Sequence, residues 1–174
     1  MKTGGKGGAN TVTGLHFEKK ADFLAVLGQV KGYSIAKDGT ISFNGTPLAM
    51  HLRKSALYKF LKAKGINHEE IISKKLLPDD AVYVFATNTL HIIEMKFQKV
   101  SGSVDEKLQT SAFKRAQYMK LVRDLGAKVE YYYILNDWFS HPSYKDVLAY
   151  IRENGCDYFF NTIPLNKLGL PEAN

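Results

Sequence analysis

Three charged side chains, at positions 79, 94 and 96, form the pattern in this sequence that is best suited to chemistry. Asp79 stands between Pro78 and a second acid, and one residue separates Glu94 from Lys96. On a β-strand alternate residues share a face, so Glu94 and Lys96 would project together. A carboxylate and an ammonium on an otherwise apolar strand are costly to bury without partners. The pattern is typical of a Mg²⁺ site, because hard cations prefer carboxylate oxygens and a lysine can hold a water or a phosphate.

The strand that carries Glu94 is expected to separate polar from apolar side chains. Ile92 and Gln98 would share the face of Glu94, and the opposite face would carry the intervening residues Ile93, Met95 and Phe97. A solvated edge strand is the alternative, which Ile92 on the same face disfavours. The second carboxylate is open between Asp79 and its neighbour Asp80, since either could lie at the start of the preceding strand.

Composition indicates one globular domain over residues 1–174. The chain is 45% hydrophobic and 12% aromatic, and no apolar run is long enough to cross a membrane. Residues 1–10 are Gly-rich and are expected to form a flexible arm without a secretory signal. The single cysteine excludes an intramolecular disulfide framework and suits the reducing cytoplasm. The net charge of +7 favours a polyanionic partner, of which nucleic acid is the commonest.

Periodicity and turn signals predict an α/β or α+β fold with a central mixed β-sheet flanked by helices. The expected helices are 13–28, 55–64, 103–125 and 143–154. The third of these begins at a capping box formed by Ser103 and Glu106. The expected strands are 33–36, 40–43, 48–52, 81–86, 90–96, 128–135 and 157–160.

The order of these elements, and the motifs on them, resemble the PD-(D/E)XK nuclease superfamily and, within it, the type II restriction endonucleases. The motifs are Pro78-Asp79, Glu94-Met95-Lys96, the run 97–110 with its continuation at 113–114 and 117–118, and the segment 7–18. The resemblance implies a restriction-endonuclease-like core, Mg²⁺ as cofactor and double-stranded DNA as substrate. It also implies a homodimer that cuts a short palindrome.

The resemblance assigns a role to each candidate residue. Asp79 and Glu94 would ligate Mg²⁺, and the preceding proline favours Asp79 over Asp80. Lys96 would orient the attacking water or stabilise the charge that develops on the phosphate. Glu18, on the first helix, would complete the metal shell or bind a second ion. Gln98 would bond a phosphate or a water.

Further basic residues are candidates for contacts with the DNA backbone. Lys107 and Lys114 lie on the helix that follows the Glu94 strand. Arg53 and Lys54 begin a basic cluster that continues with Lys59, Lys62, Lys64, Lys74 and Lys75. Clustered Lys and Arg supply salt-sensitive affinity for DNA, and a solvated helix face is the alternative. Segment 31–66 could serve DNA recognition or dimerisation.

Two other functions agree with the same residues. One is a repair or junction-resolving nuclease of the same superfamily, which would cut by DNA structure. The other is a non-catalytic DNA-binding protein in which the acids are structural. Cleavage that depends on Mg²⁺, Glu94 and Lys96 separates the enzymes from the binding protein.

Overall fold

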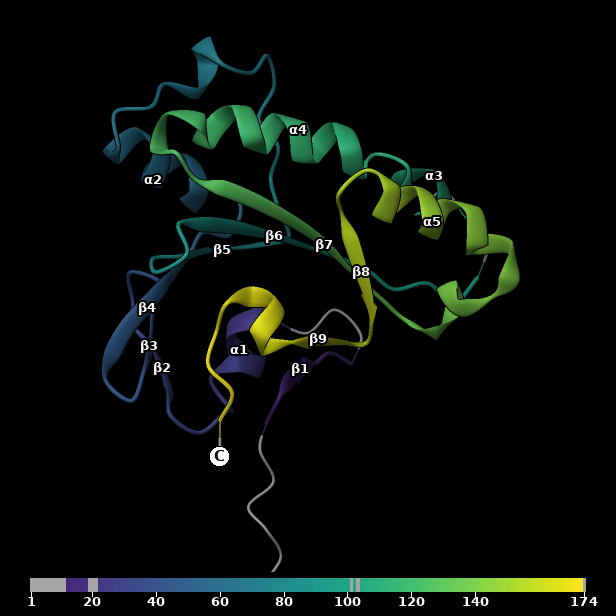
Figure 1. Ribbon diagram of the computed structural model, residues 1–174, viewed down its shortest axis with the longest axis horizontal. Helices are drawn as coiled ribbons and strands as arrows, with labels where there is room; N and C mark the ends of the chain where they lie inside the picture. The colour runs from purple at the N-terminus through teal and green to yellow at the C-terminus, as the bar shows by residue number, and fades with distance from the viewer. Residues whose placement is uncertain (1–11, 19–21, 101, 103, 174) are drawn as a thin grey trace, which may run out of the picture.

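A mixed β-sheet forms the centre of the computed structural model, which describes residues 12–18, 22–100, 102 and 104–173. Within these residues the sheet has seven strands in the order β2-β3-β4-β5-β6-β7-β8 (Figure 1). Neighbours from β2 to β6 are antiparallel, whereas β6, β7 and β8 are parallel. The strands are β2 Tyr33–Ile35, β3 Thr40–Phe43, β4 Thr46–His51, β5 Asp80–Val84, β6 Thr89–Lys96, β7 Lys128–Leu135 and β8 Asp157–Phe160. The mixed sheet with flanking helices confirms the predicted α+β class.

Helices α2 to α5 cover one face of the sheet, which we call the helical face (Figure 1). They are α2 Ala56–Ala63, α3 Val104–Leu108, α4 Ser111–Val122 and α5 Lys145–Glu153. The crossovers through α3 and α4, and then through α5, allow β6, β7 and β8 to run parallel. The helices bury Leu61, Leu121 and Ile151 against the sheet.

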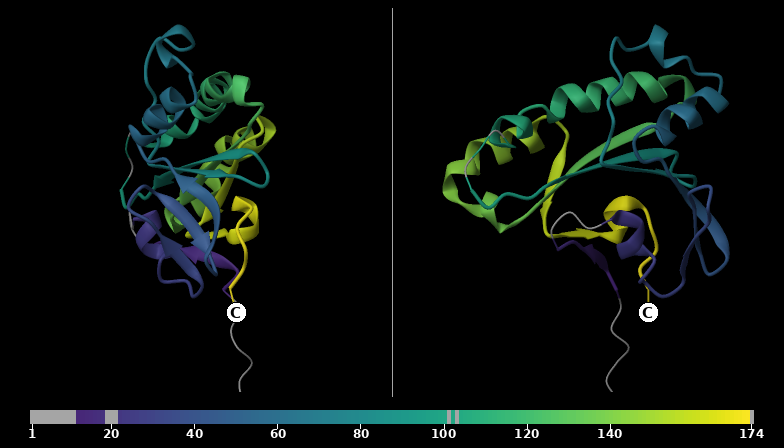
Figure 2. Two further views of the ribbon diagram at one scale, coloured as in Figure 1. Left: turned by 90° about the vertical axis from the view of Figure 1, so that its left-hand side faces the viewer. Right: turned by 180° about the vertical axis from the view of Figure 1, so that it is seen from behind.

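The opposite face is covered by the two ends of the described chain. Strands β1 (Gly14–His16) and β9 (Thr162–Pro164) form a two-stranded antiparallel sheet beneath the main one. Helix α1 (Phe23–Leu27) and the 3-10 turn Leu165–Leu168 pack beside them, as both views in Figure 2 show. We call this the closed face. The sequence analysis did not predict β9 or this turn.

The strand β6 separates its side chains as predicted. Ile92 belongs to the core of the helical face, whereas Ile93 and Met95 belong to the core of the closed face. The adjacent β7 is also buried on both sides, with Tyr131 toward the helices and Tyr132 toward the closed face. A central strand that is covered on both faces reads as a continuous apolar and aromatic run.

The prediction of a helix over residues 13–28 was wrong. Leu15 and Phe17 alternate into the closed-face core, which is the period of a strand, and β1 pairs with β9 there. The helix begins only at Phe23, because the Asp22 carboxylate accepts hydrogen bonds from the amides of Leu24 and Ala25. Among the described residues of this segment, the helix comprises five residues.

The helix predicted over residues 103–125 is divided in the structure. Ser103, the first residue of the predicted capping box, lies outside the described residues. Helix α3 ends at Leu108, α4 begins at Ser111, and the 3-10 turn Arg123–Leu125 follows. Gly126 ends the turn in the left-handed region at φ 61°.

Segment 31–66 is part of the main sheet. Strands β2, β3 and β4 extend the sheet beyond β5, and α2 lies on the helical face. In the part of the chain that the structure describes, no helix has both the length and the hydropathy needed to cross a bilayer.

Candidate functional site

Asp79, Glu94 and Lys96 meet on the helical face of the sheet. The ammonium nitrogen of Lys96 lies 2.8 Å from Glu94 Oε2 and 3.2 Å from Asp79 Oδ2. The hairpin between β5 and β6 brings them together, because its register pairs Asp80 with Ile93 and so brings Asp79 level with Glu94. The convergence predicted from the sequence is present.

The backbone of Met95 completes this cluster. Its amide donates to Asp79 Oδ2 at 3.2 Å and its carbonyl accepts from the Lys96 ammonium at 3.3 Å. Three oxygens from Asp79, Glu94 and Met95 therefore surround the Lys96 nitrogen. A sequence pattern of side chains does not reveal the carbonyl, because its direction follows from the strand geometry.

Asp80 points the other way and has a different partner. Its Oδ1 lies 2.7 Å from His51 Nε2 on β4, and the two side chains are only 5% and 7% exposed. The His51 ring stacks on Phe23 of α1, at 5.9 Å between centroids. Neighbouring residues of a strand face opposite sides. Of the two acids, Asp79 is therefore the one that contacts Lys96.

The cluster is partly buried and rich in charge. The Glu94 side chain is 6% exposed, and its Oε2 also lies 3.6 Å from the ammonium of Lys114 on α4. Burial lowers the pKa of Lys96, but the charges and hydrogen bonds of Glu94 and Asp79 raise it by more, so the pKa lies above its ordinary value. Lys96 therefore remains protonated at neutral pH.

Tyrosines form the apolar surroundings of Glu94. Burial raises the pKa of Tyr118 on α4 and of Tyr131 on β7, and the Glu94 charge raises both further. The Tyr133 hydroxyl donates to the carbonyl of Lys107 at 3.1 Å, which ties α3 to the sheet. These neutral rings exclude water from the inner side of the carboxylate and strengthen its electrostatic interactions.

The oxygens around Lys96 suit a hard divalent ion. Asp79 and Glu94 supply carboxylates and Met95 a carbonyl, and Mg²⁺ is typically held by one or two carboxylates together with waters. The Asp79 side chain is 45% exposed, so one side of the cluster is open to solvent. Within the described ranges, no group of three His, Cys, Asp or Glu side chains converges to hold a metal. The chemistry of the donor set fits Mg²⁺ through two side chains.

Glu18 does not stand where the sequence analysis expected it. It is exposed at the bend after β1, not on a helix. There it lines a hollow of about 700 Å³ together with Phe97, Gln98 and Asn136. In the described part of the chain it therefore does not form a three-acid group with Asp79 and Glu94.

Gln98 forms hydrogen bonds within the loop after β6 and with Asn136. Its side-chain nitrogen donates to the carbonyl of Val100 at 2.6 Å, and its backbone exchanges hydrogen bonds with the Asn136 side chain at 3.0 and 2.7 Å. The residue is only 7% exposed. One hydrogen of its side-chain amide is thus used within the loop, and its Oε1 has no hydrogen-bond partner among the described residues.

The predicted DNA-contacting residues lie in three places. Lys114 adjoins Glu94, and Lys107 is exposed on α3, near the helical face. Arg53 pairs with Asp22 at 2.7 Å near α1, and Lys54 is exposed in the turn before α2. Only Lys114 joins the charged cluster.

Comparison of the chain with family models, with curated proteins and with solved structures gives no match in any of the three. The resemblance to PD-(D/E)XK nucleases therefore stays a prediction from the sequence.

Proposed function

We propose that this protein is a Mg²⁺-dependent endonuclease of the type II restriction kind, which hydrolyses phosphodiester bonds in double-stranded DNA. The observation that supports the proposal is the convergence of Asp79, Glu94 and Lys96 at the open side of a half-buried cluster. The net charge of +7 suits a polyanionic substrate. A restriction-endonuclease-like core is part of the same proposal.

Asp79, Glu94 and the Met95 carbonyl would hold the metal ion. When bound, Mg²⁺ neutralises phosphate charge and lowers the pKa of a coordinated water. Holding the ion there requires the Lys96 ammonium to leave its position between the oxygens and turn toward the phosphate. The long and flexible lysine side chain permits this movement.

Lys96 would act as a positive charge and not as a base. Beside the phosphate, the protonated ammonium would stabilise the negative charge that develops when water bonds to phosphorus and a P–O ester bond breaks. Lys114, close to the same carboxylate, would balance charge on the phosphate. The surrounding tyrosines strengthen these interactions by excluding solvent.

The proposal extends to a homodimer that acts in the cytoplasm on a short palindromic site. Two-fold symmetry of the protein would match that of the site and place one cluster at each strand. Sedimentation with a duplex of the cleaved sequence tests it, since a dimer binds as two chains per site.

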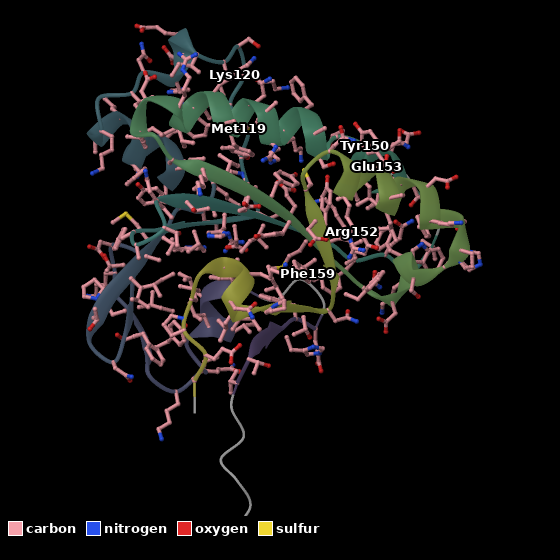
Figure 3. All side chains as sticks on the ribbon, viewed as in Figure 1. Met119, Lys120, Tyr150, Arg152, Glu153 and Phe159 are labelled. Atoms are coloured by element: carbon pink, nitrogen blue, oxygen red, sulfur yellow. The ribbon has the colours of Figure 1, made fainter. Side chains whose placement is uncertain are left out.

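Unmethylated phage DNA with Mg²⁺, followed by sequencing of the fragment ends, tests the activity. A restriction endonuclease gives discrete fragments that share one sequence at their ends. Cutting confined to branched substrates would instead indicate a junction-resolving enzyme, and DNA binding without cutting a non-catalytic protein. Glu153→Ala on α5 (Figure 3), an exposed carboxylate that is not part of the cluster, is the control for loss of an acid, and it should cut like the parent.

A further inference from the structure

A basic hollow lies between α2 and the segment that leads to β5. It has a volume of about 690 Å³, and its lining includes Lys59 and Lys62 of α2, Lys75, and a single carboxylate, Glu69. The two α2 lysines are three positions apart and so share one side of the helix. Lys75 comes from a segment more than a dozen residues further on, so the fold brings the three charges together.

The hollow is held in a defined shape. The Tyr58 hydroxyl bonds both the amide and the carbonyl of Leu76, each at 2.8 Å, which fixes segment 74–79 to α2. The Lys75 ammonium lies 5.4 Å from the centre of the Tyr58 ring, and His68 packs against the same ring at 4.7 Å. The aromatic floor therefore sets the direction of Lys75.

Among the described residues, the three lysines have no ion-pair partner within 4.0 Å. Arg152 of α5 (Figure 3) differs, because it pairs with Asp157 at 2.9 Å and stacks on Tyr158. Unpaired positive charges that converge on one concave surface favour an anion with several oxygens, such as a phosphate.

The position of the hollow relates it to the candidate active site. The chain after α2 rises, on the side of the sheet that carries α4, to the 3-10 turn His68–Glu70, and segment 71–79 then descends to β5 (Figures 1 and 2). Lys75 precedes Asp79 by four positions, so their Cα atoms are at most ~14 Å apart, by the reach of an extended chain. A DNA strand advances ~3.4 Å per nucleotide, so this upper limit corresponds to about four nucleotides.

We propose that this hollow binds a backbone phosphate within about four nucleotides of the bond that is cut. The inference rests on the proposed function, because it takes the DNA to lie across the Asp79–Glu94–Lys96 cluster. The hollow would increase the affinity for DNA and fix the position of the protein along the duplex, without taking part in the bond-breaking step.

The test measures binding to a duplex in EDTA at several KCl concentrations. The variant Lys59→Gln/Lys62→Gln/Lys75→Gln should bind more weakly, and the slope of log K against log[KCl] should become shallower by about 1 for each phosphate that the variant no longer neutralises. The cleavage rate of the preformed complex with Mg²⁺ should remain within about twofold of the parent, since no residue of the cluster is changed.

The matched control removes three exposed lysines elsewhere, in Lys128→Gln/Lys145→Gln/Lys167→Gln. Its salt dependence should stay close to that of the parent. An unchanged slope in the hollow variant, an equal change in the control, or a parent that does not bind duplex DNA would each overturn the proposal. Failure of the proposed function looks different, because the parent would then show hollow-dependent binding but no cleavage.

Discussion

Asp79 and Asp80 are neighbours in the chain and have opposite surroundings. Asp79 is 45% exposed on the helical face and shares Lys96 with Glu94. Asp80 is 5% exposed on the closed face and has one partner, His51. The first acid is open to an ion from solvent, whereas the second is buried with His51 against its Oδ1. Exposure to solvent and the number of charged groups around a carboxylate, more than residue type, therefore distinguish a reactive acid from a structural one.

The largest expected effect is on the helical face. Glu94→Ala and Lys96→Ala should each reduce cleavage at least about 10³-fold, about 4 kcal/mol of transition-state stabilisation, because each removes a charge from the reacting centre. Binding to duplex DNA should survive. Rates at saturating Mg²⁺, together with gel-shift affinities, check this, with Glu153→Ala as control. Cleavage near the parental rate in either variant contradicts the catalytic role.

The reciprocal pair of substitutions separates the two acids. Asp80→Ala should lower the free energy of unfolding by up to about 3 kcal/mol, because it leaves a ring nitrogen of the buried His51 without its hydrogen-bond partner. Asp79→Ala should change stability by less than about 1 kcal/mol, since its ion pair is half exposed, and should abolish cleavage. Urea denaturation of both variants measures the difference. Equal stability losses would remove the distinction between the faces.

His91 on β6 extends the comparison, because it lies buried on the closed face and neither ring nitrogen has a partner among the described residues. Burial lowers its pKa from 6.5 to about 4. Between these values the unfolded chain binds a proton that the folded protein does not, so stability falls as pH falls from 6.5 to about 4, by about 3 kcal/mol in all.

The variant His91→Leu should lose this acid sensitivity. Unfolding by urea at about pH 7 and about pH 4.5 checks it, with His141→Leu, an exposed histidine, as control. The parent and the control should lose more stability over this range than His91→Leu does. The same loss in all three proteins contradicts the assignment to His91.

The smallest expected effect concerns ion binding. Lys96→Met should bind Ca²⁺ or Mg²⁺ about tenfold more tightly, about 1.4 kcal/mol, because the ammonium no longer competes for the same oxygens. Calorimetric titration without DNA measures this, and Lys120→Met on the exposed side of α4 (Figure 3) should bind like the parent. Weaker binding in Lys96→Met would mean that the lysine supports the ion and does not compete with it.

The sequence was sufficient where one local rule governed the outcome. Alternation placed Glu94 and Lys96 together, and turn residues located the β5–β6 hairpin that brings Asp79 to them. The first helix failed because β1 depends on β9, almost 150 residues away, and a local pattern does not contain that partner. The same error placed Glu18 at the site, whereas it lies at the bend after β1.

Other features of the site depended on tertiary contacts. Asp80 pairs with His51 because β4 and β5 are neighbours in the sheet. The Tyr131 ring lies near Glu94 because β6 and β7 pair in parallel. Lys114 was expected at the DNA but not beside Glu94, because its direction follows from where α4 packs. The strands predicted within segment 31–66 are present, but their order at one end of the main sheet follows only from their pairing.

Met95 separates two kinds of constraint at a single position. Its amide donates a hydrogen bond to Asp79 and its carbonyl accepts one from Lys96, whereas its side chain is buried in the core of the closed face. Leucine or isoleucine could therefore replace it with little effect on the polar geometry, provided that the volume is kept. Proline could not, because the amide hydrogen that anchors Asp79 would be gone. The side chain between Glu94 and Lys96 is thus constrained only by the volume of the core, whereas the backbone is constrained by its amide hydrogen bond.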